Sequence, residues 1–129
     1  MSIRILVIDD EETIRKLFIS TLKGTGYQVE TAESGEHGIE KARETKFNLI
    51  FIDLKMPGIN GVETLRELWK MGQTVPIYII TAFYDDFIDQ LQSAANDAMS
   101  FQVIQKPVSV DEIRSIAEAV AEHQIQYSG

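Results

Sequence analysis

The sequence lacks cysteine, long apolar runs and any cluster of basic residues, and each absence removes a class of protein. Without cysteine, disulfide bonds and thiol chemistry are excluded, which fits an intracellular protein. No apolar run approaches the roughly 20 residues that span a bilayer, and the N-terminus has none of the features of a signal peptide. The net charge of −8 argues against direct binding of nucleic acid or of an anionic membrane. We therefore expect a cytoplasmic protein.

The 129 residues have the composition of one globular domain, with 44% hydrophobic and 25% charged residues. Strand-like apolar runs alternate with segments of helical periodicity, and the connections are short. Such alternation predicts an α/β fold, in which helices cover both faces of a parallel sheet. Ser34 and Ser109 are the predicted N-caps of the second and last helices. The predicted strands span residues 4–8, 27–31, 48–52, 77–80 and 101–104, and the predicted helices span residues 11–23, 34–45, 62–70, 85–95 and 110–122.

Two of the apolar runs stop on aspartate. The first runs into Asp9 and Asp10, and the third runs into Asp53. Runs of this kind are typical of strands buried on both faces of a parallel sheet, where ligands bind beyond the carboxyl ends of the strands. If the two strands are neighbours, three carboxylates meet. Their repulsion requires a hard divalent cation, a nearby lysine or a raised pKa.

The fourth and fifth strands also end in polar residues, Thr81 and Lys106. Each residue alone has an ordinary explanation, because an aspartate often caps the next helix and a lysine before a turn is often solvated. Four of five predicted strands, however, end in such residues at one edge of the sheet. This pattern indicates a binding or chemical site at that edge.

The same positions carry a resemblance to the receiver domain of bacterial two-component response regulators, which extends from about Ser2 to His123. The resemblance implies a flavodoxin-like (βα)5 three-layer sandwich with a parallel five-stranded sheet in the order 2-1-3-4-5. It also implies a receiver domain over residues 1–123, followed by a tail or linker stub at 124–129. The motifs that carry it are Leu6-Val7-Ile8-Asp9-Asp10, Ile50-Phe51-Ile52-Asp53-Leu54-Lys55-Met56-Pro57-Gly58-Ile59-Asn60-Gly61, Ile79-Ile80-Thr81-Ala82 and Gln105-Lys106-Pro107.

The resemblance implies that Asp53 is a phosphoacceptor, a carboxylate nucleophile that forms an aspartyl phosphate. Asp10 and Asp53 would ligate Mg²⁺ directly, while Asp9 would hold a coordinated water. The backbone carbonyl of Lys55 would complete the protein ligands, and Mn²⁺ could replace Mg²⁺. The implied partner is a histidine kinase or a histidine phosphotransfer protein. The domain would then be a phosphoacceptor with self-catalysed transfer and slow loss of the phosphoryl group, and not a true enzyme.

Two further residues have implied roles around the phosphoryl group. Lys106 would pair with its oxygens, and Thr81 would donate a hydrogen bond to another oxygen and move toward it. Because X–Pro bonds make the cis form cheap, a cis bond between Lys106 and Pro107 is expected, and it would direct the lysine into the site.

The sequence departs from the receiver pattern on its output side, formed by the fourth helix, the fifth strand and the fifth helix. Val103 stands where receivers usually carry an aromatic residue, and Phe101 lies two residues earlier on the same strand face. Lys55 and Phe83 flank the path of the attacking water and should set the lifetime of the phosphoryl group. Because Phe83 can shield the group and Lys55 can pair with it, we predict slow self-dephosphorylation.

The residues fit two other functions less well. A phosphohydrolase of the haloacid-dehalogenase type needs a second aspartate two residues after the nucleophile, where this chain has Lys55. A flavodoxin-type carrier needs a hydroxyl- and glycine-rich loop after the first strand, and residues 11–14 do not provide it. A pseudo-receiver that only binds proteins stays an alternative. The chain could be a free-standing regulator or the N-terminal receiver of a longer one, with an unknown output domain or protein.

Overall fold

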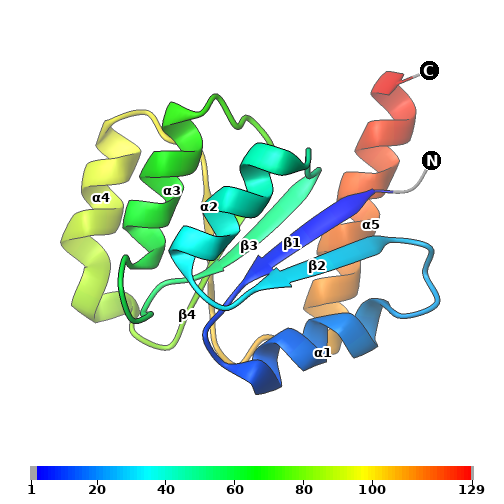
Figure 1. Cartoon of the computed structure of the whole chain (residues 1–129), viewed down its shortest axis with the longest axis horizontal. Coiled ribbons are helices and arrows are strands. Elements are labelled where there is room, and N and C mark those ends of the chain that lie inside the picture. Colours follow the sequence, from blue (N-terminus) through cyan, green and yellow to red (C-terminus); the bar gives the residue numbers. More distant parts are fainter. Residues whose placement is uncertain (1–2, 129) are drawn as a thin grey trace.

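A computed structural model describes residues 3–128 of the chain, and side chains are described for residues 3–123. Its strands form one parallel sheet in the order β2-β1-β3-β4-β5. The strand arrows in Figure 1 point to the same edge of the sheet, where their carboxyl ends meet. The predicted α/β class and the predicted strand order are confirmed. The strands are β1 (Arg4–Ile8), β2 (Gln28–Ala32), β3 (Leu49–Asp53), β4 (Ile77–Thr81) and β5 (Gln102–Gln105).

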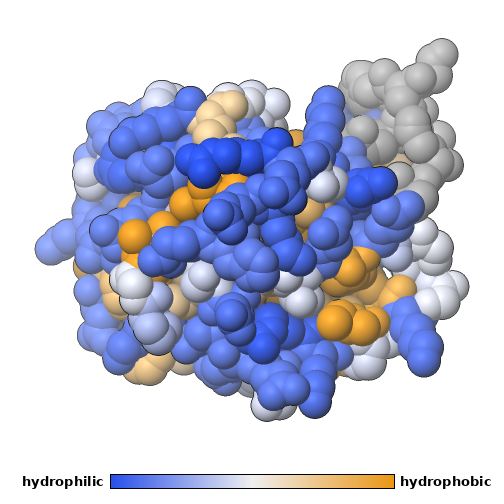
Figure 2. Space-filling model, in the orientation of Figure 1, coloured by the Kyte–Doolittle hydropathy of each residue, from blue (hydrophilic) through white to orange (hydrophobic). Residues whose placement is uncertain are grey.

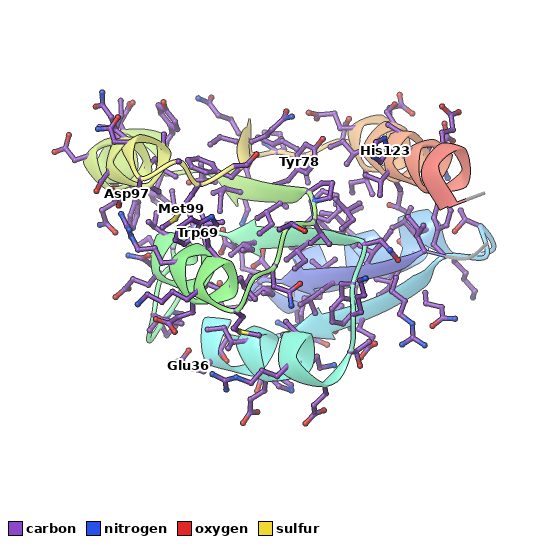
Figure 3. The ribbon with its side chains drawn as sticks, turned by 90° about the horizontal axis from the view of Figure 1, so that it is seen from above. Glu36, Trp69, Tyr78, Asp97, Met99 and His123 are labelled. Carbon is purple, nitrogen blue, oxygen red and sulfur yellow. The ribbon has the colours of Figure 1, made fainter. Side chains whose placement is uncertain are left out.

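Helices cover both faces of the sheet and complete a three-layer sandwich. Helices α2, α3 and α4 lie on one side, while α1 and α5 lie on the other (Figures 1 and 3). Figure 3 shows Trp69 of α3 and His123 of α5 on opposite sides of the sheet. Two separate apolar clusters fill the spaces between the layers. The helices are α1 (Glu12–Leu22), α2 (Gly35–Glu44), α3 (Gly61–Lys70), α4 (Ile88–Asn96) and α5 (Val110–Ser128), and a 3-10 turn, η1 (Tyr84–Phe87), precedes α4.

The two aspartate-ending strands, β1 and β3, lie side by side in the interior of the sheet. All five residues of β3 are buried, as expected of a strand covered on both faces. The Phe51 ring contacts Phe18 of α1 and Tyr78 of β4, with ring centroids 4.7 and 5.7 Å apart. Each fully buried side chain of this size contributes about 1.5–3 kcal/mol, so the core holds the strand ends rigidly in place.

Helix caps fix where the helices begin. The Ser34 hydroxyl accepts a hydrogen bond from the His37 amide, which confirms the predicted cap of α2. Ser109, the predicted N-cap of α5, forms a capping box with Glu112 through two reciprocal hydrogen bonds of 3.0 Å. The entries into these helices are therefore set by local sequence alone.

Some predicted boundaries are wrong. Strands β2, β3 and β5 each begin one residue later than predicted, and the predicted helix from 85 begins instead with the turn η1. Tyr84 and Phe87 pack against the core in that turn, which tightens the chain before α4 starts. Helix α5 continues to Ser128 instead of ending near Glu122, because residues 123–128 contain neither glycine nor proline. The tail or linker role of residues 124–129 stays a prediction.

The surface in the view of Figure 2 is mostly hydrophilic, with small and separate apolar patches. The exposed large apolar side chains are also scattered over several elements: Ile19, Trp69, Phe83, Ile88 and Val110. Within residues 3–128, no helix combines the length and the apolar character that crossing a membrane requires.

Candidate functional site

The strand ends bring the predicted site residues together at one edge of the sheet. Ile8 pairs with Ile52, so Asp9 lies beside Asp53 one step further along the neighbouring strands. Thr81 is the last residue of β4, and its carbonyl accepts a hydrogen bond of 2.8 Å from the Lys106 amide. Strands β1, β3 and β4 and the residue that follows β5 thus converge on one spot, as the sequence predicts.

Three carboxylates occupy the centre of this site. One oxygen each from Asp9, Asp10 and Asp53 lies within 4.8 Å of the others. Asp9 and Asp53 are buried, with 1% and 5% exposure, while Asp10 is exposed. The Oδ1 of Asp9 accepts a hydrogen bond from the Glu11 amide, but its buried Oδ2 accepts none from the described residues. A cluster of carboxylate oxygens with one buried oxygen lacking a donor fits a hard divalent cation such as Mg²⁺.

The Lys106 ammonium is the positive charge that balances these carboxylates. Its Nζ lies 3.3 Å from Asp53 Oδ1 and 3.5 Å from Asp9 Oδ2. It also donates a hydrogen bond of 3.3 Å to Oε1 of Glu11, which lies just before α1. The predicted cis bond between Lys106 and Pro107 is confirmed. One ammonium thus serves several carboxylates, so the site keeps an excess of negative charge.

That excess appears in the pKa values of the buried groups. Burial, reinforced by the charge of Asp9, raises the pKa of Asp53 to about 7, and Lys106 offsets only part of this rise. Burial also raises the pKa of Asp9. Burial lowers the pKa of Lys106, but Asp53 and Asp9 raise it by more, so its net direction is upward. The site therefore binds a proton or a further cation readily near neutral pH.

The loop after β3 folds back over the end of that strand. The Leu54 carbonyl accepts a hydrogen bond of 2.7 Å from the Gly61 amide. A side chain at Gly61 would not fit, because its Cβ would lie 2.6 Å from the Asp53 carbonyl oxygen and 2.8 Å from the Leu54 Cα. This close approach keeps the loop, including Lys55, beside Asp53 at the end of β3. The ligand role of the Lys55 carbonyl stays a prediction.

Thr81 and Phe83 form the other wall of the site. The buried Thr81 hydroxyl accepts a hydrogen bond of 2.7 Å from the Phe83 amide. The Phe83 ring is 43% exposed, and the Lys55 Nζ lies 4.3 Å from its centroid, a cation–π contact. Thr81, Phe83 and Lys106 also line an open cavity of about 310 Å³. Lys55 and Phe83, predicted to act together on phosphoryl lifetime, are thus in direct contact.

The predicted switch residues Phe101 and Val103 do not join the carboxylates and Lys106. They pack against the apolar cluster under α3 and α4. Both side chains are partly buried there, which confirms that they share a face. Tyr84 and Phe87 pack against the same cluster. The aromatic surface near the site therefore comes from the β4–α4 connection, and the switch roles of Phe101 and Val103 stay predictions.

Glu11 also belongs to the site, although its sequence pattern does not predict this. An acidic residue directly after the Asp-Asp pair is interpreted there as part of a helix start. Its partner, Lys106, is 95 residues away in the chain, so spacing gives no sign of the contact. The only available signal is its place next to Asp10 at the end of a buried strand.

Comparisons with known proteins agree with this geometry. Residues 5–118 match the family described as the response regulator receiver domain. The transcriptional regulatory protein ZraR of Klebsiella oxytoca is 32% identical over 127 residues, which cover 96% of this chain and 28% of ZraR. The chain spans about a quarter to a half of the length of such curated relatives.

Solved structures show the same fold over nearly the whole chain. A CheY-like receiver domain protein from Methanospirillum hungatei superposes with a TM-score of 0.83 at 27% identity, covering 98% of this chain and 99% of that one. The response regulator TrrA of Thermotoga maritima, in complex with Mg²⁺-BeF, has a TM-score of 0.75 at 34% identity. It covers 93% of this chain and 99% of its own.

Proposed function

The chain belongs to the response regulator receiver domain family, and from this membership we propose that Asp53 accepts a phosphoryl group from a histidine kinase or a histidine phosphotransfer protein. One observation carries the proposal. Asp53 lies buried at the end of β3, with the Lys106 ammonium 3.3 Å from one oxygen and the carboxylates of Asp9 and Asp10 beside it. A nucleophile, a cation that can pair with phosphate and a set of metal ligands thus meet at one point.

In the proposed transfer, a carboxylate oxygen of Asp53 attacks phosphorus, and the bond between phosphorus and the donor's histidine nitrogen breaks. Asp53 must be ionised to act, although its pKa is raised to about 7. Lys106 pairs with the phosphoryl oxygens, and the Thr81 hydroxyl donates a hydrogen bond to one of them. Asp10 and Asp53 would ligate a divalent cation directly and Asp9 would hold one of its waters, and the cation would offset charge between the carboxylate and the phosphoryl group.

The proposed switch begins at the Thr81 hydroxyl. In the structure this hydroxyl accepts a hydrogen bond from the Phe83 amide. Turning the hydroxyl toward a phosphoryl oxygen would change that hydrogen bond and therefore the conformation of the β4–α4 connection. Through this connection the signal reaches the output face of α4, β5 and α5. The presence of the complete site, Lys106 and Thr81 included, favours this function over a pseudo-receiver that only binds proteins.

The proposal extends to the setting of the protein. TrrA, a relative, is in complex with Mg²⁺-BeF, which supports Mg²⁺ as the cofactor here, with Mn²⁺ as a substitute. ZraR is named as a transcriptional regulatory protein, so an output on DNA would reside in another domain or partner, because this domain carries a net charge of −8. We infer a cytoplasmic location, where histidine kinases present their phosphorylated histidines.

Intact-mass measurement after incubation with acetyl phosphate and Mg²⁺ tests the proposal. Wild type should gain the mass of one phosphoryl group, and Asp53→Ala should gain none. Asp86→Ala is the matched control, because Asp86 is an exposed carboxylate that lines the cavity beside the site. It should gain the group as wild type does. No gain in wild type, or an equal gain in Asp53→Ala, contradicts the proposal.

A further inference from the structure

Glu11 contacts the lysine on which phosphoryl binding depends. Its Oε1 lies 3.3 Å from the Lys106 Nζ, as close as Asp53 Oδ1 and closer than Asp9 Oδ2. The Lys106 side chain is 14% exposed, whereas that of Glu11 is 58% exposed. In Figure 1 the connection from β1 to α1 and the segment leading into α5 lie side by side at the lower edge of the sheet. The contact therefore joins two elements at the mouth of the site.

Helix capping does not account for the Glu11 carboxylate. Glu11 is the N-cap residue of α1, yet its side chain makes no capping hydrogen bond. Its own amide is bonded to Asp9 Oδ1 at 2.9 Å. The first turn is instead held by the Glu11 carbonyl, which accepts from Ile14 and Arg15 at 3.1 and 3.2 Å. The side chain is thus free of a role within its helix and is directed to Lys106.

We propose that Glu11 is a positioning residue that holds the Lys106 ammonium on the α1 side of the site and competes with the incoming phosphoryl group for it. This inference rests on the proposed phosphorylation of Asp53. A phosphoryl group on Asp53 needs the ammonium that Asp53, Asp9 and Glu11 now share. Lys106 must leave Glu11, or Glu11 must turn into solvent, before the phosphoryl oxygens are fully paired.

The size of the effect follows from the exposure of Glu11. An ion pair with one exposed partner contributes little free energy, because solvent screens it. Removing the Glu11 charge should therefore tighten binding of a phosphoryl mimic by roughly two- to fivefold. Glu12 provides a matched comparison at the next position. It is exposed and pairs with Lys16 at 2.9 Å within α1, and it has no contact with Lys106. Its charge is screened by solvent, so its removal should leave binding within about 1.5-fold of wild type.

The test uses beryllofluoride, titrated at fixed Mg²⁺ into ¹⁵N-labelled wild type, Glu11→Gln and Glu12→Gln. The Thr81 amide signal gives the half-saturating concentration, and the side-chain signals of Lys106 report on its environment. In Glu11→Gln the half-saturating concentration should fall roughly two- to fivefold, and the Lys106 signals should shift. In Glu12→Gln neither should change. A merely structural role for Glu11 would change unfolding by urea without moving the Lys106 signals.

The two proposals fail in different ways. Wild type that neither binds beryllofluoride nor gains phosphoryl mass from acetyl phosphate contradicts the phosphorylation of Asp53. If wild type binds beryllofluoride and gains phosphoryl mass, but the half-saturating concentration of Glu11→Gln equals that of wild type or of Glu12→Gln, only the role of Glu11 is overturned. Unfolding in urea, measured for each variant, confirms that all three proteins are folded during the titration.

Discussion

Replacing Asp53 by asparagine should make the metal-free protein more stable, because the buried carboxylate is costly to ionise. Burial and Asp9 raise the pKa of Asp53 to about 7 from its ordinary value of 3.8. The folded chain thus binds this proton more tightly than the unfolded chain does. Stability from this group is highest below about pH 4, falls as the pH rises toward 7 and is constant above that.

The magnitude follows from the same pKa. The difference between 3.8 and about 7 corresponds to about 4 kcal/mol of unfolding free energy above pH 7. Asparagine, like the protonated carboxyl group, carries no charge and so avoids most of this cost, and the pKa of about 7 already includes the attraction of Lys106. Asp53→Asn should therefore be more stable than wild type by about 2–4 kcal/mol at pH 8 and by about 1 kcal/mol at pH 4.5.

Urea unfolding followed by circular dichroism, in EDTA at both pH values, measures this difference. Asp89→Asn is the control, because Asp89 is an exposed aspartate in the first turn of α4. It should change stability by less than about 0.5 kcal/mol at either pH. An equal difference between wild type and Asp53→Asn at pH 4.5 and pH 8, or a less stable variant at pH 8, refutes the reasoning.

Three further predictions concern the metal, the phosphoryl lifetime and the loop after β3. Mg²⁺ at ten times its dissociation constant should stabilise wild type by about 1.4 kcal/mol in thermal unfolding. The same Mg²⁺ concentration should stabilise Asp53→Asn by clearly less, because the variant lacks the Asp53 carboxylate as a ligand. Equal stabilisation of the two proteins would place the cation elsewhere. Wild type should lose its phosphoryl group slowly, because Lys55 and Phe83, which are in contact, are predicted to shield the group from water. Phe83→Ala or Lys55→Met should therefore shorten the half-life several-fold in intact-mass time courses, and a wild-type half-life of seconds contradicts this. Gly61→Ala should cost about 2–4 kcal/mol in urea unfolding, because its Cβ would meet backbone atoms that cannot rotate away, and a cost below about 0.5 kcal/mol would show that the loop relaxes freely.

The sequence predicts the sheet and the centre of the site well, for a physical reason. Buried parallel strands are continuous apolar runs, so the residue at which the run stops, such as Asp53, marks the edge where ligands bind. The N-cap at Ser109, which forms a capping box with Glu112, is an equally local feature. Features that depend on three to five consecutive residues are therefore readable from sequence.

Features that depend on tertiary contacts are not readable in this way. The turn η1 forms because Tyr84 and Phe87 pack against the core. No local sequence pattern predicts that packing. The contact between Glu11 and Lys106 joins residues 95 positions apart. The stacking of Lys55 on Phe83 likewise depends on how two loops lie across the site. Such contacts form the surroundings of the site, while the local pattern supplies its carboxylates.

Locating the phosphoryl group on the chain tests the proposed role of Asp53 most directly. Protein treated with acetyl phosphate and Mg²⁺ is reduced with sodium borohydride, which converts an aspartyl phosphate to homoserine, and is then digested for peptide mass spectrometry. Phosphorylation of Asp53 predicts homoserine at position 53 and unmodified aspartate at positions 9 and 10. Homoserine at another position, or none in protein that remains folded with Mg²⁺ present, would contradict the role of Asp53 as phosphoacceptor.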